Sequence, residues 1–215
     1  MQLIDYGSSQ VVYLMNVFRP QGAAYVPEIA TNIIARYQFA KPPTLDEIRK
    51  DAVKFQVGKF GDTQIEEFGV YGDGIAASGK CPTETLEAFL ADVVAFGAKE
   101  IGFVPILEHR NEAYFESTIT VKSETDLGAF VMPRADELIR KFLNQKTGVE
   151  FQPSGIVMDC HPLISASRQR RKPARFFIER KLGFPYEEHL FLCIAPLRTK
   201  DHLDLLTALE REASQ

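Results

Sequence analysis

Three charged residues in the second half of the chain have the types and spacing that phosphodiester hydrolysis requires. Asp159 ends one apolar stretch, and Glu179 and Lys181 form a Glu-x-Lys triplet in the next. Two carboxylates on neighbouring strands offer the hard oxygen ligands that divalent cations prefer. A lysine beside them would orient the attacking water and stabilise the negative charge that develops on the phosphate.

This arrangement resembles the core of PD-(D/E)xK nucleases, and the resemblance implies a metal-dependent nuclease with Asp159, Glu179 and Lys181 as catalytic residues. Only three positions carry it, and Met158 stands where the motif has its proline. A Glu-x-Lys triplet is also short enough to occur on any solvated strand. We keep the nuclease as the alternative function. A divalent metal is expected only under that alternative, and no other cofactor is predicted.

A basic stretch separates Asp159 from the Glu-x-Lys triplet. It contains Arg168, Arg170, Arg171, Lys172 and Arg175. In contrast, residues 62–92 carry seven acidic residues and one lysine. Such asymmetry steers partners of opposite charge, and arginine presents a fork that suits carboxylates and phosphates. We predict that the five cations contact an anionic partner, which is an acidic protein surface, nucleic acid or the acidic region of a second copy. A solvated loop is the alternative interpretation.

Other reactive side chains lack the spacing of a site. Cys160 and His161 are adjacent, so on a strand they point to opposite faces. The four histidines are scattered without metal-ligand spacing. The glycine-containing range 69–79 lacks the spacing of a phosphate-binding loop. We predict no metal site from these residues, and a Cys–His pair assembled by the fold stays open.

The composition describes an ordinary globular protein. The chain has 215 residues, 45% of them hydrophobic and 25% charged, with a formal net charge of −4. This balance excludes a globally basic nucleic-acid binder but permits a local basic patch. No apolar run approaches the roughly 18 residues of a membrane span, and the first ten residues do not resemble a signal peptide. Three widely spaced cysteines give no disulfide framework, so we expect a soluble, cytoplasmic protein.

Alternation and helical periodicity predict the elements that must position these residues. Strands are expected over 10–18, 54–60, 65–77, 114–123, 155–160, 175–181 and 189–195, with a bulge or hairpin near 72–74. Helices are expected after Pro27, over 44–51, from Pro82 to Phe96, from Pro133 to about 147, and from Thr199 onward. The apolar stripe of the third helix is Leu86, Phe89, Leu90, Val93 and Val94, and that of the last helix is Leu203, Leu205, Leu206 and Leu209.

The two halves of the sequence resemble each other. The range 54–59 parallels 175–180, and 65–67 parallels 186–188, both at an offset of 121. Ile75-Ala76 then parallels Ile194-Ala195, and the helix at Thr83 parallels the helix at Thr199. Because all α+β halves share apolar patterns, a chance match is the alternative to duplication.

These observations predict an α+β fold with mostly antiparallel sheet, helices packed on one side, and an internal duplication of a β-α-β-β-α unit. The halves would be residues 1–100 and 101–215, either separate or joined in one continuous domain. The predicted function is that of a non-enzymatic interaction protein and component of a larger assembly. Its partner is a protein or another anionic molecule, with nucleic acid and self-association left open and no membrane involved.

Overall fold

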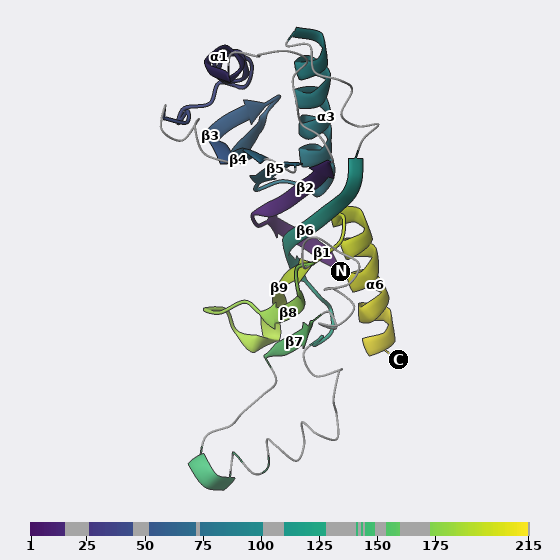
Figure 1. Ribbon diagram of the computed structural model, residues 1–215. Coiled ribbons are helices and arrows are strands. Elements are labelled where there is room, and N and C mark those ends of the chain that lie inside the picture. The colour runs from purple at the N-terminus through teal and green to yellow at the C-terminus, as the bar shows by residue number, and fades with distance from the viewer. Residues whose placement is uncertain are drawn as a thin grey trace. The chain divides into compact units, whose positions relative to one another are not determined.

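The computed structural model describes residues 1–15, 26–44, 52–71, 74–100, 110–127, 141, 143, 145–148, 154–159 and 173–214. The strands are β1 (Gln2–Tyr6), β2 (Ser9–Met15), β3 (Ala52–Phe60), β4 (Thr63–Tyr71), β5 (Gly74–Gly79), β6 (Arg110–Lys122), β7 (Gly155–Met158), β8 (Phe176–Arg180) and β9 (Leu190–Ala195). The helices that position the two cores are α1 (Val26–Tyr37), α3 (Thr83–Glu100) and α6 (Thr199–Ala213), and a 3-10 turn, η2, spans Tyr186–Glu188 (Figure 1). None of the described helices is long and apolar enough to cross a membrane.

The fold is α+β, as predicted, and the described residues form nine antiparallel strands. Their order is β3-β4-β5-β2-β6-β9-β8-β7, and β1 pairs with β6 beside this path. The chain divides into two compact units. Unit 1 is Met1–Tyr6 with Ser117–Gln215, and unit 2 is Gly7–Glu116. The division falls inside β6, which pairs with β2 in unit 2 and with β1 and β9 in unit 1.

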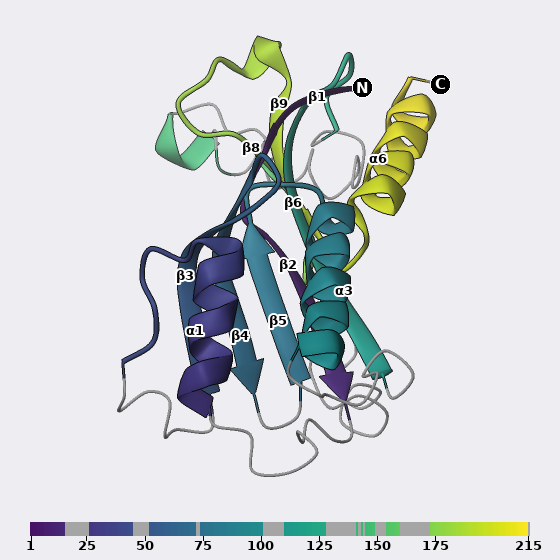
Figure 2. The same ribbon diagram turned by 90° about the horizontal axis from the view of Figure 1, so that it is seen from above.

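Unit 2 buries an aromatic core between its strands and two helices. Figure 2 shows α1 and α3 on the same face of the strands β3, β4, β5 and β2. Phe68 lies at the centre, with its ring centroid 5.7 Å from that of Phe55 and 5.5 Å from that of Phe89. The predicted stripe of α3 is confirmed, because Leu86, Phe89, Leu90, Val93 and Val94 are all buried.

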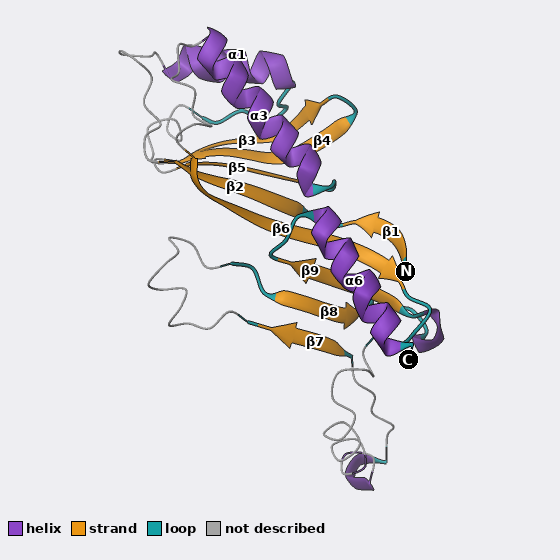
Figure 3. Ribbon diagram, turned by 90° about the vertical axis from the view of Figure 1, so that its right-hand side faces the viewer, coloured by secondary structure: helices purple, strands orange, loops and turns teal. Residues whose placement is uncertain are grey.

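Unit 1 packs α6 against β6, β9 and β8 (Figure 3). Its core consists of Ile119, Val121, Leu127, Ile178, Phe191, Cys193 and Leu206. The predicted stripe of α6 is wrong at one position: Leu205 is 37% exposed, whereas Leu206 is fully buried. Leu203, Leu206 and Leu209 fall on one face at spacings of three residues, and Leu205 lies off that face.

The structure confirms some predicted elements and corrects others. The interruption near 72–74 separates two paired strands, β4 and β5, so the hairpin interpretation is correct. Strand β1 had no counterpart in the sequence prediction, because residues 2–6 lack a run of β-branched or aromatic side chains. The predicted helix over 44–51 and most of the helix after Pro133 lie outside the described residues, although 141, 143 and 145–147 are helical.

Two of the four residue matches that suggested a duplication do not occupy matching strand positions, whereas Ile75-Ala76 and Ile194-Ala195 lie in the strands that precede α3 and α6. Residues 54–59 lie in β3, which pairs with β4 at the end of the strand order, whereas 176–180 form β8 between β7 and β9. Residues 65–67 lie in β4, but 186–188 form the 3-10 turn η2. These matches failed because alternating aromatic and β-branched residues occur on any half-buried strand.

Candidate functional site

The residues of the predicted nuclease motif lie apart along the β7–β8 ladder. Gly155 faces Glu179 in this ladder, and Asp159 directly follows β7. Asp159 Oδ2 accepts a hydrogen bond from Nε of Arg175 at 3.1 Å, which places it at the opposite end of β8 from Glu179. Asp159 is four residues beyond Gly155, the residue that faces Glu179. At about 3.3 Å per residue, Asp159 and Glu179 are therefore roughly 13 Å apart along the strand direction. The register therefore does not bring Asp159 and Glu179 to one metal ion.

Lys181 lies beyond the end of β8, where its amino nitrogen is 5.6 Å from the centre of the Phe184 ring. Within the described part of the chain, no group of three or more histidine, cysteine, aspartate or glutamate side chains could hold a metal ion. The described geometry thus gives the nuclease alternative no assembled catalytic centre.

Most of the predicted partner-binding cations lie outside the described residues. These are Arg168, Arg170, Arg171 and Lys172. Arg175 is described, and its side chain is 65% exposed beside Asp159. The prediction for the first four therefore stays a prediction from sequence, and Arg175 marks the point where the basic stretch enters β8.

Most exposed large apolar side chains of the described chain belong to β7 and to the connection between β8 and β9. Eight large hydrophobic residues of the described chain are exposed, and five of them fall between residues 157 and 186. These five are Val157, Met158, Leu182, Phe184 and Tyr186, with exposures from 45% to 88%. We call them the apolar surface of unit 1. Val157 and Met158 belong to β7, whereas Leu182, Phe184 and Tyr186 belong to the connection between β8 and β9, and exposed large apolar residues of this kind are candidates for contact with a partner.

Arg180 shapes the connection between β8 and β9 that carries three of these residues. Its guanidinium pairs with Asp126, donates a hydrogen bond to the carbonyl oxygen of Tyr186 at 3.0 Å, and lies 4.4 Å from the centre of the Tyr186 ring. Gly183 and His189 have φ angles of 85° and 47°, which reverse the chain at either end of the connection. The exposed side chains are therefore presented by a folded loop.

A buried polar cluster lies beneath the start of α6. His202 Nδ1 is 3.2 Å from Ser117 Oγ, whose hydroxyl donates to Thr199 Oγ1 at 3.2 Å. All three residues are buried, and among the described residues His202 Nε2 has no hydrogen-bond partner. Burial lowers the pKa of His202 to about 4, so the imidazole is neutral at pH 7. This cluster is not visible in the sequence, since Ser117 and His202 are 85 residues apart.

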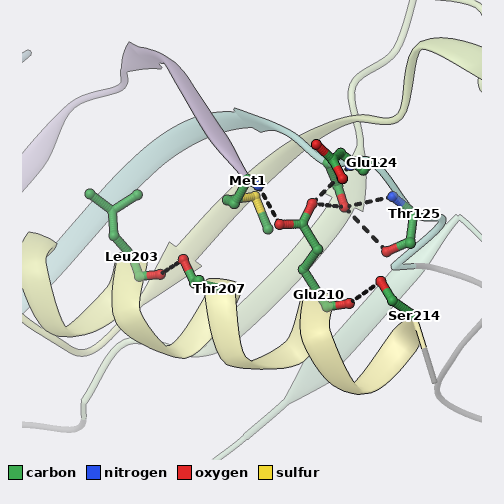
Figure 4. A network of polar contacts seen from close by, with 8 residues as sticks. Met1, Glu124, Thr125, Leu203, Thr207, Glu210 and Ser214 are labelled. Carbon is green, nitrogen blue, oxygen red and sulfur yellow. Dashed lines mark hydrogen bonds and ion pairs between the residues drawn. The ribbon is translucent and has the colours of Figure 1, made fainter.

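A second polar network ties the first residue to α6 (Figure 4). The amino group of Met1 pairs with Glu210, which also accepts hydrogen bonds from the Ser123 hydroxyl and the Glu124 amide, both at 2.8 Å. Burial by itself raises the pKa of Glu210, but these hydrogen bonds outweigh it and hold the pKa below its usual range. The network joins β1, the end of β6 and α6, so its role is structural.

An ion pair joins the two described helices of unit 2, α1 and α3. Arg36 Nη2 lies 2.9 Å from Asp92 Oδ1, and the Tyr37 hydroxyl donates to Asp92 Oδ2 at 2.7 Å. Burial raises the pKa of the Asp92 carboxyl, but its hydrogen bonds with Arg36 and Tyr37 produce a net lowering. Since every member of this cluster is engaged by another, it holds α1 against α3.

The described cysteines are core residues. Burial raises the pKa of Cys81 to about 11 and that of Cys193 to about 12, so both remain protonated thiols at neutral pH. Cys81 and Cys193 are therefore inert core thiols, while Cys160 lies outside the described residues.

Comparison with known proteins assigns no family to the chain. No protein-family model and no curated protein matches the sequence.

Proposed function

We propose that this chain is a soluble, cytoplasmic, non-enzymatic binding protein that engages a protein partner through unit 1. The observation that carries the proposal is the apolar surface of unit 1, which holds five of the eight exposed large hydrophobic residues of the described chain. Burying such surface against a partner removes it from water, which is favourable by about 25 cal/mol per Å² of apolar area. The chain then acts as a component of a larger assembly.

The charge of the neighbouring sequence supports an acidic partner. Five cations, Arg168, Arg170, Arg171, Lys172 and Arg175, lie in the segment that joins β7 to β8. An interface with an apolar centre and a charged rim is the usual composition of protein–protein contacts. Nucleic acid is less well supported, because three of the five side chains of the apolar surface of unit 1 are aliphatic, and aliphatic side chains do not stack on bases as aromatic rings do.

We also propose that the two units descend from an internal duplication, in an alignment that keeps the match of Thr83 with Thr199 and changes the pairing of the earlier strands. Ser9 faces Gly79 in unit 2, and Ser117 faces Ala195 in unit 1. Thr83 lies four residues after Gly79, and Thr199 lies four residues after Ala195. Each threonine is the first residue of a helix. Shared register and a shared serine and threonine support this proposal more strongly than apolar patterns do.

Site-specific photo-crosslinking tests the proposed function. A benzophenone amino acid replaces Phe184, which is 45% exposed on the apolar surface, and in a matched control it replaces Leu205, which is 37% exposed on α6. Illumination in the source cells should give a discrete protein adduct from position 184 and none from position 205. The double substitution Arg170→Glu and Arg171→Glu should reduce the adduct, because a rim of reversed charge slows association with an acidic partner.

Three outcomes would count against the proposal. Equal adducts from both positions would mean non-specific contact, and no adduct at all would leave the apolar surface without a partner. An adduct that disappears after nuclease treatment would identify nucleic acid instead of a protein.

A further inference from the structure

The outer edge of β7 presents backbone groups that no described residue pairs with. Among the described strands, β7 pairs with β8 alone. The Arg180 amide donates to the carbonyl oxygen of Ser154 at 2.7 Å, which sets the phase of the ladder. Opposite residues of an antiparallel ladder alternate between hydrogen-bonded and non-hydrogen-bonded pairs. The backbone of Ile156 is therefore hydrogen-bonded to β8, whereas the N–H and C=O groups of Gly155 and Val157 point away from β8.

Strand β3 of unit 2 provides an internal comparison for this edge. Each of the two strands pairs, among the named strands, with one neighbour only, β3 with β4 and β7 with β8. Phe55 faces Phe68 in the first ladder, and Ile156 faces Ile178 in the second. Phe68 and Ile178 are both fully buried core residues. Aligning the ladders on these pairs places Gln56 of unit 2 at the position of Val157 in unit 1.

Unit 2 covers its edge with an extended segment of its own chain. The Gln56 amide donates to the Lys41 carbonyl oxygen at 3.0 Å, and the Lys41 amide donates to the Gln56 carbonyl oxygen at 3.1 Å. Phe39, two residues earlier, is only 4% exposed and contacts the rings of Phe55 and Phe68. No described residue makes the corresponding backbone contacts to Val157.

The side chains beside this edge indicate what would bind there. Val157 and Met158 are 62% and 61% exposed, so an added strand would bury apolar surface as well as form backbone hydrogen bonds. Arg175 uses only its Nε–H on Asp159 among the described residues. Its two terminal nitrogens can therefore donate hydrogen bonds to a further carboxylate, since a guanidinium has five N–H donors.

We propose that an extended segment of the partner protein adds to β7 as an antiparallel strand, with apolar residues beside Val157 and an acidic residue near Arg175. This inference rests on the proposed function and specifies its mode. Backbone bonds give such strand addition its affinity, and alternate side chains give it specificity. Because β7 has only four residues, the carboxylate and the apolar contacts must supply part of the binding energy.

Hydrogen exchange measured by NMR on the full chain tests the edge directly. In the free protein the Ile156 amide should be protected and the Val157 amide should exchange freely. The probe is a synthetic peptide of alternating valine and threonine with one glutamate at its amino end, added at millimolar concentration. It should slow exchange of the Val157 amide by about tenfold or more, as expected for a bonded strand amide. A peptide of the same sequence with N-methylated backbone amides should have no effect.

Two variants of Val157 link the edge to the cellular partner. Val157→Pro removes an N–H that points away from β8, so the β7–β8 ladder is kept while strand addition is lost. Val157→Thr keeps that donor and serves as the matched control. The adduct formed from position 184 should disappear in the proline variant and persist in the threonine variant.

The alternatives give different results. Protection of the Val157 amide in the free chain at low concentration would show that the chain covers its own edge, and protection that grows with protein concentration would identify a second copy. Either result overturns the inference. An adduct that persists in Val157→Pro overturns strand addition and leaves the proposed function standing, whereas no adduct in any variant removes the proposed function itself.

Discussion

Replacing His202 with leucine should remove a large part of the acid sensitivity of this protein. His202 is fully buried, and burial lowers its pKa from 6.5 to about 4. The unfolded chain therefore binds more protons at this residue than the folded chain does as the pH falls below 6.5. Folded-state stability is lost through that window, and the loss stops near pH 4. Leucine is the matched replacement, because Leu86 of α3 follows Thr83 as His202 of α6 follows Thr199.

The size of the effect follows from the pKa difference. A shift of about 2.5 units corresponds to roughly 3 kcal/mol over the whole window, and to about 2 kcal/mol between pH 7.5 and pH 5. At pH 7.5 the variant should lie within about 1 kcal/mol of the wild type, since the lost hydrogen bond to Ser117 is offset by removal of an imidazole nitrogen without a described partner.

The assay is urea unfolding followed by far-UV circular dichroism at the two pH values, because the chain contains no tryptophan. The wild type should lose about 2 kcal/mol more than His202→Leu on acidification. Glu210 and the other titrating groups are common to both proteins, so the difference between them isolates His202. An equal pH dependence in both proteins, or an NMR titration of His202 near pH 6.5, would refute the reasoning.

Three further changes should alter stability in ways that the same assay measures. Phe89→Ala should cost about 3–5 kcal/mol, because a fully buried ring at the centre of unit 2 leaves a cavity; a cost below about 1 kcal/mol would mean that this face of α3 is not core. Val57→Gly should gain about 1 kcal/mol, since Val57 has a φ of 58° that a β-branched residue adopts only with strain, and Val57→Ala should show no such gain. Glu210→Gln should cost about 1–3 kcal/mol through its hydrogen-bonded network, whereas Glu212→Gln, exposed on the same helix, should be neutral.

Local sequence patterns were sufficient for the elements that alternate or repeat clearly. The alternation around Phe115 to Val121 identified β6, and the spacing of Leu86, Phe89 and Val93 identified the buried face of α3. Leu205 was misassigned, because a leucine-rich helix offers two overlapping apolar faces and only the sheet beneath it selects one. Strand β1 carries no local signal, so its pairing with β6 depends on the tertiary structure.

The candidate site depended on strand register, which sequence alone does not supply. Asp159 and Glu179 looked like metal ligands in sequence, but the ladder places Arg175 beside Asp159 and Gly155 beside Glu179. The exposure of Val157 could not be predicted either, since a short apolar strand at the edge of a sheet has the same sequence pattern as a central strand. Charge asymmetry, in contrast, is visible in sequence, and the prediction that the cations from Arg168 to Arg175 contact a partner stays a prediction.

The most direct test of the account is the ratio of adduct yields from benzophenone placed at position 184 on the apolar surface of unit 1 and at position 205 on α6. Both side chains are comparably exposed, at 45% and 37%, so exposure alone does not separate them. The account predicts one discrete protein adduct from position 184, with position 205 giving only background. Equal yields from the two positions, or background from both, would contradict the claim that the apolar surface of unit 1 is the binding site.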